Sequence, residues 1–297
     1  MIATSSAFKA SARLAALALL PIAYGFIEAR SYRIRTYRVP VLPPGSGDLT
    51  ILQLSDFHLR RKKRKMIGFL ESLHERRFDL VFATGDLLGD PDSVDTCLRL
   101  LNGMQGMAAR CFVFGSSDYY APILKNYLDY FFGRRRHSTD RNPTRKFRSG
   151  LLEAGWVDLN NSQTFLELEG IRIQLTGLDD PYLHRDDRRL LVRDPSAGLA
   201  ILVVHDPAPY ADARRAGYNL VVAGHTHGGQ VRMPFLGALV TNSTLPTSLA
   251  RGLSHLDPGW LFVSPGLGTG KYAPFRFLCP PEASVIQLVH QPDSEEP

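Results

Sequence analysis

The chain has 297 residues, of which 44% are hydrophobic and 22% charged, and its formal net charge is +6. This length and composition allow one large domain or two small ones, and the positive charge indicates anionic surfaces or substrates. The three cysteines lie far apart and lack any CxxC spacing, which excludes a disulfide framework and a zinc knuckle. We expect Cys97 and Cys111 to be thiols of the core.

An apolar run from Leu14 to Ile27 follows Lys9 and Arg13 near the N-terminus. The run spans about 14 residues, fewer than the roughly 20 that cross a bilayer. Its order, basic and then apolar, also fits a signal peptide, but no convincing small-x-small cleavage site follows it. A buried N-terminal helix is a further alternative. We predict that residues 1–29 form a short membrane anchor or interfacial helix.

The next segment is rich in arginine and then in proline and glycine, and we predict that residues 30–48 form a linker. The arginines favour a cytoplasmic placement of everything downstream, so the expected location is the cytoplasmic face of the cell membrane. A globular domain is predicted at residues 49–292, and residues 293–297 are predicted to be a tail. The arginines of this segment are Arg30, Arg33, Arg35 and Arg38.

The first half of the domain alternates apolar runs with helical patterns. Strands are predicted at 50–55, 80–84 and 111–114, and helices at 66–77 and 93–103. The strands end in Asp56-Phe57-His58, Gly85-Asp86 and Gly115-Ser116-Ser117-Asp118. This order is typical of a layered α/β protein, whose ligands gather at the carboxyl ends of strands. The basic run at 60–65 is expected to be a solvated loop, or to hold the domain to anionic lipid.

The second half continues this pattern after a basic stretch at 134–148, which we expect to be an exposed insertion. A hairpin is predicted at 165–175, and a short helix at 208–216. Further strands are predicted at 199–204, which ends in His205, and at 220–223, 260–263 and 284–288.

The strand at 220–223 leads directly into Gly224-His225-Thr226-His227-Gly228-Gly229-Gln230. Two imidazoles in a loop at the end of a strand can aim at one small volume, and imidazole is a common ligand of transition metals. Gly228 and Gly229 are expected to let the backbone approach whatever lies there. The alternative is a polar turn with two surface histidines.

Taken in order, Asp56-x-His58, Gly85-Asp86, Gly115-x-x-Asp118, His205 and Gly224-His225-x-His227 resemble the calcineurin-like metallophosphoesterase superfamily. The short apolar N-terminus makes the chain look most like the membrane-associated bacterial branch that includes the UDP-2,3-diacylglucosamine pyrophosphatases. The resemblance implies an α/β fold, a four-layer α-β-β-α sandwich of two mixed sheets flanked by helices.

The resemblance also implies a dinuclear metal centre. Asp56, His58 and His227 would hold one ion, His205 and His225 the other, and Asp86 would bridge both. Mixed imidazole and carboxylate ligands favour Mn, Fe or Zn over Ca or Mg. In such a centre a hydroxide that bridges two divalent transition-metal ions hydrolyses a phosphodiester or pyrophosphate bond. The implied substrate is a phosphorylated small molecule or lipid, and an anionic membrane surface is an expected partner.

The chain departs from the family at its third motif. Ser116 stands where the family has an asparagine ligand, and Ser117 stands where it has a histidine that can protonate the leaving group. Loss of that acid is worth about 10²–10⁴-fold, which favours substrates with good leaving groups, such as phosphoanhydrides. Asp118 is the substitute that we predict as a catalytic residue, and His184 is a second candidate, for which the alternative is a histidine of a surface loop. Arg276 is expected either to bind a phosphate oxygen of the substrate or to be a surface arginine.

Two other interpretations compete with an enzyme. A degenerate, non-catalytic protein that binds metal or phosphate and retains the fold would explain the serine pair, although six intact ligand positions count against it. Nucleic acid is not expected as a partner, because the basic runs lack interleaved aromatic residues. The segment Gly266-Leu267-Gly268-Thr269-Gly270-Lys271 is not a P-loop, since Pro265 and Tyr272 break that motif.

Overall fold

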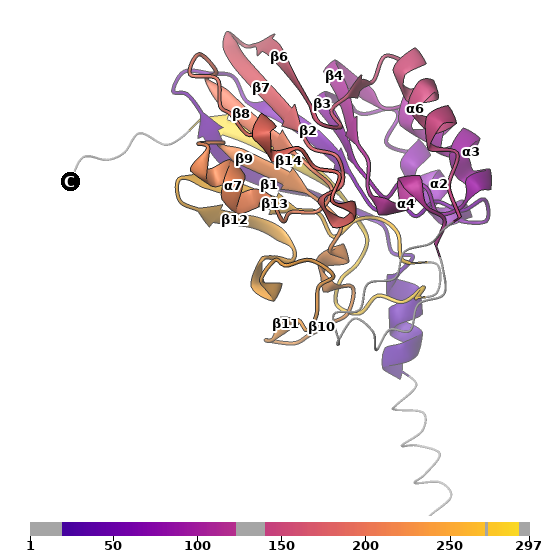
Figure 1. Cartoon of the computed structure of the whole chain (residues 1–297). Helices are drawn as coiled ribbons and strands as arrows, with labels where there is room; N and C mark the ends of the chain where they lie inside the picture. The colour runs from indigo at the N-terminus through magenta and orange to yellow at the C-terminus, as the bar shows by residue number, and fades with distance from the viewer. Residues whose placement is uncertain (1–19, 123–139, 271–272, 291–297) are drawn as a thin grey trace, which may run out of the picture.

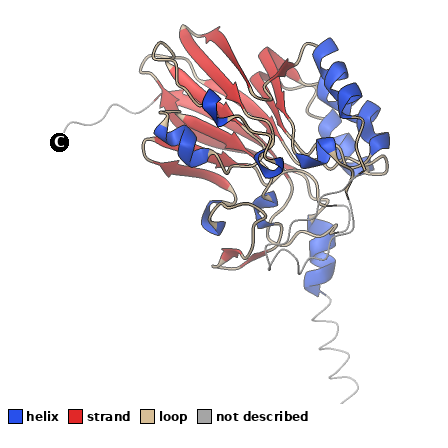
Figure 2. Ribbon diagram, in the orientation of Figure 1, coloured by secondary structure: helices blue, strands red, loops and turns tan. Residues whose placement is uncertain are grey.

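The structure is a computed structural model, and it describes residues 20–122, 140–270 and 273–290. At its centre two six-stranded mixed sheets pack face to face (Figure 1). Helices cover the outer face of the first sheet, and a thinner layer of short helices and loops covers the second (Figure 2). This is a four-layer α-β-β-α sandwich, so the predicted fold class is confirmed.

The first sheet combines parallel and antiparallel neighbours. Its strands, in spatial order, are β1 (Arg33–Leu42), β14 (Glu282–His290), β2 (Leu49–Leu54), β3 (Arg77–Thr84), β4 (Gln105–Val113) and β5 (Val157–Asp158). The helices on its outer face are α2 (Arg64–Glu71), α3 (Val94–Asn102) and α6 (Thr144–Glu153). The short helix α4 (Ser116–Tyr119) follows β4.

The second sheet is mixed in the same way. Its strands, in spatial order, are β12 (Gly252–Leu256), β13 (Gly259–Val263), β9 (Leu220–Ala223), β8 (Leu199–Val203), β7 (Ile171–Gly177) and β6 (Ser162–Leu168). The central strands β8 and β9 are buried over their whole length, as their unbroken apolar sequences require. Helix α7 (Tyr210–Arg215) lies on the outer face, and β10 (Arg232–Met233) and β11 (Gly237–Ala238) form a separate hairpin.

The predicted strands and the predicted hairpin are present, with ends shifted by a few residues, and all three cysteines are buried and free. The helix predicted at 66–77 ends at Glu71, because the chain turns there before β3 begins at Arg77. The exposed insertion predicted at 134–148 lies partly outside the described residues. Its described end is wrong, because residues 144–153 form helix α6, which buries Phe147 and Leu151.

The linker predicted at residues 30–48 is also wrong over most of its length. Residues 33–42 form β1, which pairs in parallel with β14 at the edge of the first sheet. Val39 and Leu42 are buried between the sheets. The proline and glycine that indicated a linker are confined to the end of β1 and the turn after it.

Residues 20–28 are helical, and the last turn of this helix packs on the domain. The buried Glu28 accepts a hydrogen bond from the backbone N–H of Cys279 at 3.1 Å, and Gly25 lies against the Phe275 ring with no room for a Cβ atom. The helix end is therefore part of the domain. Residues 1–19, which are most of the predicted anchor, and the predicted tail at 293–297 lie outside the described residues. None of the described helices is long and apolar enough to span a bilayer.

Candidate metal centre

The six predicted ligands lie in loops that follow the carboxyl ends of central strands. Both sheets contribute, because their strand ends meet at one edge of the sandwich (Figure 1). Asp56 and His58 follow β2, Asp86 follows β3, His205 follows β8, and His225 and His227 follow β9.

The structure brings the six into two groups of three, and within each group the ligand atoms all lie within 4.8 Å of one another. The first group is Asp56, His58 and His227. Nε2 of His58 and Nε2 of His227 are 3.1 Å apart, and Oδ1 of Asp56 is 3.7 Å from Nε2 of His227. Both histidines keep a small exposed fraction, so this group is the one closer to solvent.

The second group is Asp86, His205 and His225, and it is buried. Nε2 of His205 lies 3.5 Å from Oδ2 of Asp86 and 3.2 Å from Nδ1 of His225. The same Asp86 oxygen lies 3.5 Å from Nε2 of His58. One carboxylate oxygen therefore stands between the two groups, as a bridging ligand must.

Backbone partners orient the histidines of the second group. The Thr84 carbonyl lies 2.8 Å from Nδ1 of His205, and the Asn242 carbonyl lies 3.4 Å from Nε2 of His225. A carbonyl only accepts, so each of these ring nitrogens carries a proton. In the neutral rings the lone pairs of His205 Nε2 and His225 Nδ1 then face each other across 3.2 Å. Only a proton or a metal ion between them makes that contact favourable.

The ligand loops have an unusual backbone. Asp56, His58, Asp86, His225 and His227 all have positive φ angles, between 39° and 69°. This conformation is uncommon for residues with a side chain and costs on the order of 1–3 kcal/mol at each position. Gly224 packs too closely against this loop for any side chain. A Cβ atom there would lie 2.0 Å from Oγ of Ser55 and 2.7 Å from Oδ2 of Asp56.

The protonation equilibria of these side chains are strongly perturbed. Burial raises the pKa of Asp56 to about 6, and burial lowers the pKa of His58 to about 4. Burial acts to lower the pKa of His205, but the charge and hydrogen bond of Asp86 outweigh it and hold that pKa well above its ordinary value. The metal-free centre therefore holds a proton on His205 beside an ionised Asp86, in the place where a cation would bind.

The donor set fits a metal ion. Oδ1 of Asp56 is buried without a hydrogen-bond partner, although it belongs to the first group. Burying such an atom without a partner is costly, and a cation would satisfy it. Four imidazoles and two carboxylates are the ligand types of Zn, Mn and Fe rather than of Ca or Mg.

The third motif takes a structural role through its backbone. The N–H of Ser117 donates to Oδ1 of Asp86 at 2.7 Å, which helps to hold the carboxylate between the two groups. Oγ of Ser117 is buried and has no hydrogen-bond partner. Ser116 is half-buried at the start of α4.

Asp118 lies behind the metal centre and is fully buried. Its carboxylate accepts hydrogen bonds from the backbone N–H groups of Leu87, Leu88 and Gly115, at 2.9–3.0 Å. With its oxygens turned to these loops it cannot reach a substrate. Its geometry contradicts the predicted catalytic role, and it is a positioning residue for the loop that carries Asp86.

Arg276 is likewise buried, so neither substrate binding nor a surface position describes it. Its guanidinium donates to the backbone carbonyls of Pro265, Gly268 and Cys279 and lies 3.4 Å from Nδ1 of His227. It holds the glycine-rich turn at 266–270 beside the first ligand group.

The sequence reasoning missed Asp206, although it directly follows His205. Oδ2 of Asp206 lies 3.7 Å from Nε2 of His225, and its Oδ1 accepts a hydrogen bond from Ser243. It also missed how the Asp180 loop lines the second group. The Tyr182 ring contacts the His225 ring at 5.2 Å between centroids, and burial raises the pKa of Asp180 to about 8.

The role predicted for the glycines after His227 is half right. Gly228 and Gly229 do adopt positive φ angles, 63° and 81°. The atoms that approach them closely belong to the protein, namely Cys279 and Ala238. These glycines allow tight packing of the loop behind His227.

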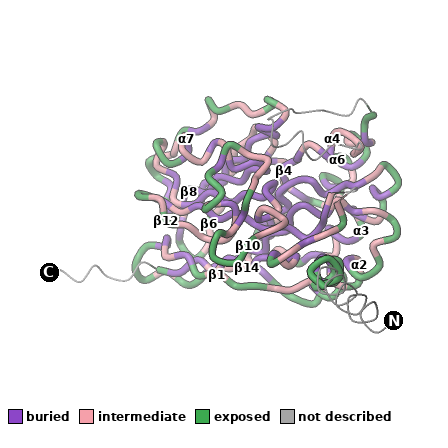
Figure 3. The backbone as a smooth tube through the Cα atoms, turned by 90° about the horizontal axis from the view of Figure 1, so that it is seen from below, coloured by how far each residue is buried: buried purple, intermediate pink, exposed green. Residues whose placement is uncertain are grey.

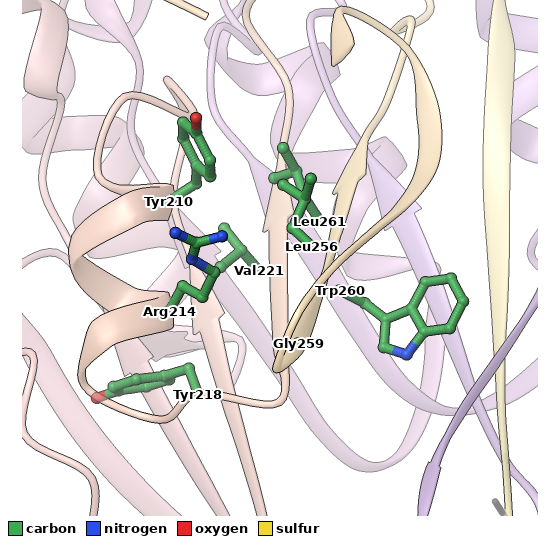
Figure 4. Close-up of a pocket in the computed structure, with 8 residues that line it drawn as sticks. All are labelled: Tyr210, Arg214, Tyr218, Val221, Leu256, Gly259, Trp260 and Leu261. Atoms are coloured by element: carbon green, nitrogen blue, oxygen red, sulfur yellow. The ribbon is translucent and has the colours of Figure 1, made fainter.

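A small pocket elsewhere does not belong to this centre (Figure 4). It is lined by Tyr210, Arg214 and Tyr218 on one side and by Trp260 and Leu261 on the other. These residues surround the amino ends of β9 and β13, whereas the ligands follow the carboxyl end of β9.

Comparison with known proteins identifies the family. The family profile described as calcineurin-like phosphoesterase matches residues 49–229. The metallophosphoesterase YkuE of Bacillus subtilis is 26% identical over 260 residues, which cover 85% of this chain and 83% of that protein. A metallophosphoesterase of Aquifex aeolicus is 27% identical over 278 residues, which cover 92% of this chain and 97% of that protein. A zebrafish (Danio rerio) protein named as a transmembrane protein with a metallophosphoesterase domain is 26% identical over 89% of this chain, which spans 59% of that protein.

Proposed function

This chain belongs to the calcineurin-like phosphoesterase family and is a phosphoric ester hydrolase, and from that premise we propose that its two ligand groups bind two divalent transition-metal ions, Mn, Fe or Zn. Asp56, His58 and His227 would hold one ion, and His205 and His225 the other. Bound there, the ions would supply Lewis-acid activation of a phosphoryl group and a water molecule of lowered pKa.

One observation carries this proposal. Oδ2 of Asp86 lies 3.5 Å from Nε2 of His58 and 3.5 Å from Nε2 of His205, in different ligand groups. A single carboxylate at equal distance from two sets of imidazoles serves two cations better than one. The Ser117 N–H and the neighbouring histidines favour its ionised form, as a ligand requires.

We propose phosphodiesters or phosphoanhydrides as substrates, with a preference for good leaving groups. The support is that Ser117 takes the place of the family's histidine acid and that, in the described part of the chain, no histidine other than the four ligands contacts the centre. His74 and His255 contact Leu100 and Trp260 elsewhere, and His184 is exposed in the loop after Tyr182. Asp118, the predicted substitute, faces the backbone.

Asp86→Asn tests the dinuclear centre. The amide is neutral and a poorer ligand, so the chain should lose metal and hydrolysis together. Both should fall by about a hundredfold or more, since even the outer partners of metal ligands are worth 10–100-fold. Metal analysis of protein purified without chelator, paired with a panel of phosphodiesters and pyrophosphates, measures this. Asp95→Asn, an exposed carboxylate on α3 that pairs with Lys146, is the matched control. Full metal content and rate in Asp86→Asn would contradict the proposal.

A non-catalytic protein that retains the fold is the second candidate, and the Ser116-Ser117 pair favours it. The same experiment separates the two candidates. Wild-type protein that binds two ions per chain yet hydrolyses nothing in the panel would support the non-catalytic interpretation.

We propose in addition that the substrate is lipid-linked and that the domain works at the cytoplasmic face of the cell membrane. The supports are the apolar run at 14–27 and the name of the zebrafish relative. Arg33, one of the arginines that favour this placement, pairs within the domain with Glu282 at 3.5 Å. Hydrolysis of a pyrophosphate-linked lipid in vesicles should exceed that of its water-soluble head-group analogue. Equal rates on both would overturn this part of the proposal.

A further inference from the structure

Exposed large apolar side chains of the described chain are concentrated in one region. Of the fourteen exposed large apolar side chains in the described residues, ten fall in three segments. These are Leu20, Ile22, Tyr24, Phe26 and Ile27 in the first segment, Met233, Phe235, Leu236 and Leu239 in the second, and Leu278 in the third. The remaining four, Met107, Leu152, Phe165 and Val192, lie in other parts of the fold.

The three segments touch one another. The Tyr24 and Phe277 rings are 5.5 Å apart and the Phe26 and Phe275 rings 5.8 Å apart, which joins the helix at 20–28 to the segment 275–278. That segment is joined to the hairpin in turn, because the N–H of Arg232 donates to the Phe277 carbonyl at 2.9 Å.

The segments also share a side of the molecule. The helix at 20–28 and the β10–β11 hairpin both lie at the lower end of the fold (Figure 1). Seen from below, both include residues coloured as exposed (Figure 3). At the hairpin tip Phe235 is 109% exposed and Leu236 75% exposed, so the tip projects into solvent. Apolar patches of this kind mark interaction sites on soluble surfaces.

We propose that residues 20–27, 233–239 and 278 form a membrane-docking face, and that the hairpin tip inserts into the lipid head-group region. Charge complementarity favours a bilayer as the occupant. Exposed basic residues lie at 61 and 62, just before α2, and at 64 and 65 in its first turn, and Figure 3 shows α2 beside the helix at 20–28. Basic side chains next to exposed aromatic and leucine side chains are the combination that binds anionic membranes.

The chain beyond the described residues favours the same occupant. The apolar sequence of the helix continues toward the N-terminus from Leu20 to Leu14, with Arg13 and Lys9 before it. That sequence is apolar and basic, like the docking face, and it joins the described chain at Leu20.

Docking would place the metal centre at the membrane surface. His227 precedes the hairpin by a few residues, and Nε2 of Gln230 between them donates to the Ala273 carbonyl at 3.1 Å. The placement of the metal centre at the membrane matters only if the proposed function holds, and this part of the inference rests on it. The substrate class would then be a phosphate compound at a bilayer surface. The docking itself does not depend on catalysis.

Fluorescence of Phe235→Trp in the full chain tests insertion of the tip. On addition of vesicles of phosphatidylcholine with phosphatidylglycerol, its emission should shift to the blue as the indole leaves water. Val192→Trp, a substitution at an exposed apolar residue away from the face, is the matched control and should not shift. Trp156 and Trp260 contribute the same background to both variants. Equal shifts in the two variants, or none in either, would overturn the proposal.

Vesicle flotation of a double variant tests the contribution to binding. Phe235→Ser with Leu236→Ser should weaken partitioning about tenfold or more, since a bulky apolar side chain gains strongly on leaving water. Leu152→Ser with Val192→Ser should bind like the wild type. Omitting phosphatidylglycerol should weaken the vesicle binding of all these proteins, because only the apolar contacts then remain. Unchanged partitioning of the tip variant would overturn the role of the hairpin.

A second copy of the chain is the alternative partner that could cover this apolar face. Light scattering without lipid decides this, because a dimer that the tip variant dissociates would overturn the membrane proposal. Hydrolysis of a soluble substrate is measured in parallel. Vesicle binding without hydrolysis would refute the proposed function alone, and hydrolysis without vesicle binding would refute the docking face alone.

Discussion

Asp86 and Asp118 are two buried carboxylates with different roles. Asp86 turns Oδ2 toward imidazoles of both ligand groups. Asp118 turns its oxygens toward backbone N–H groups, among them those of Leu87 and Leu88, which directly follow Asp86. One carboxylate is placed to bind metal, and the other holds the first in place.

Replacement of Asp118 by asparagine should therefore act on stability and metal affinity. The amide would present an NH₂ group to the N–H of Gly115 and leave a buried donor unpaired, at a cost of about 1–3 kcal/mol in the free energy of unfolding. Chemical denaturation with and without metal measures this, with Asp95→Asn as control. Excess metal should restore most of the rate. A rate that stays low at full metal occupancy, with a changed pH profile, would instead indicate a catalytic Asp118.

The serine pair predicts a dependence on the leaving group. Ser116→Asn with Ser117→His restores an amide ligand and an acid, so the rate should rise most for substrates with poor leaving groups, by up to about 10²–10⁴-fold. Activated substrates, such as aryl phosphodiesters, should gain little. Because Ser117 is buried, Ser116→Asn alone is the companion variant that introduces no bulk there. A loss for both substrate classes would show that the site is built around the serines.

At the scale of elements, the edge strand β1 decides where the domain begins. It pairs with β14 along its whole length and buries Val39 and Leu42 between the sheets. The helix at 20–28 adds a buried carboxylate, Glu28, which accepts a hydrogen bond from the backbone N–H of Cys279. The domain therefore begins at the last turn of the helix at 20–28, and β1 belongs to it.

Removal of residues 1–44 should consequently abolish folding, whereas removal of residues 1–19 should preserve it. Each fully buried aliphatic side chain is worth about 1.5–3 kcal/mol, so loss of Val39, Val41 and Leu42 approaches the whole stability of a typical domain, about 5–15 kcal/mol. Thermal denaturation and soluble yield of the two truncated proteins check this. A folded, active protein that begins at residue 45 would show that β1 is dispensable.

At the scale of the whole molecule, metal binding and proton binding compete. Burial raises the pKa of Asp56 to about 6, and the pKa of His205 lies above its ordinary value, so the metal-free protein binds protons at both ligands once the pH falls to about 6. Burial lowers the pKa of His58 to about 4, so this ligand is already free of a proton there.

Metal affinity should accordingly fall as the pH decreases through about 6. Because these pKa values are raised, protons must leave the ligands when metal binds. Each proton released changes the apparent metal affinity by about tenfold per pH unit. Calorimetric titration with Mn²⁺ at pH 5.5, 6.5 and 7.5, in two buffers of different ionisation enthalpy, measures both affinity and proton release. Constant affinity without proton release over this range would contradict the assigned ligands.

The amino-acid sequence by itself determined the central strands and the order of the residues that follow them. Those features depend on local patterns: apolar runs long enough for a strand, and glycine, aspartate or histidine where each run stops. The layered α/β class could therefore be predicted from these patterns, and the four-layer sandwich and the six ligands from the family resemblance that the motifs carry.

Only the tertiary structure decided what depends on distant partners. β1 is a strand because β14, at the other end of the chain, pairs with it, and its own sequence resembled a linker. Asp118 and Arg276 looked available for catalysis, but burial against backbone from other loops assigns both to structure. The apolar helix end and the hairpin at 233–239 form one face because the segment 275–278 joins them. No local pattern encodes such contacts, since burial and hydrogen bonding depend on which segments the fold brings together.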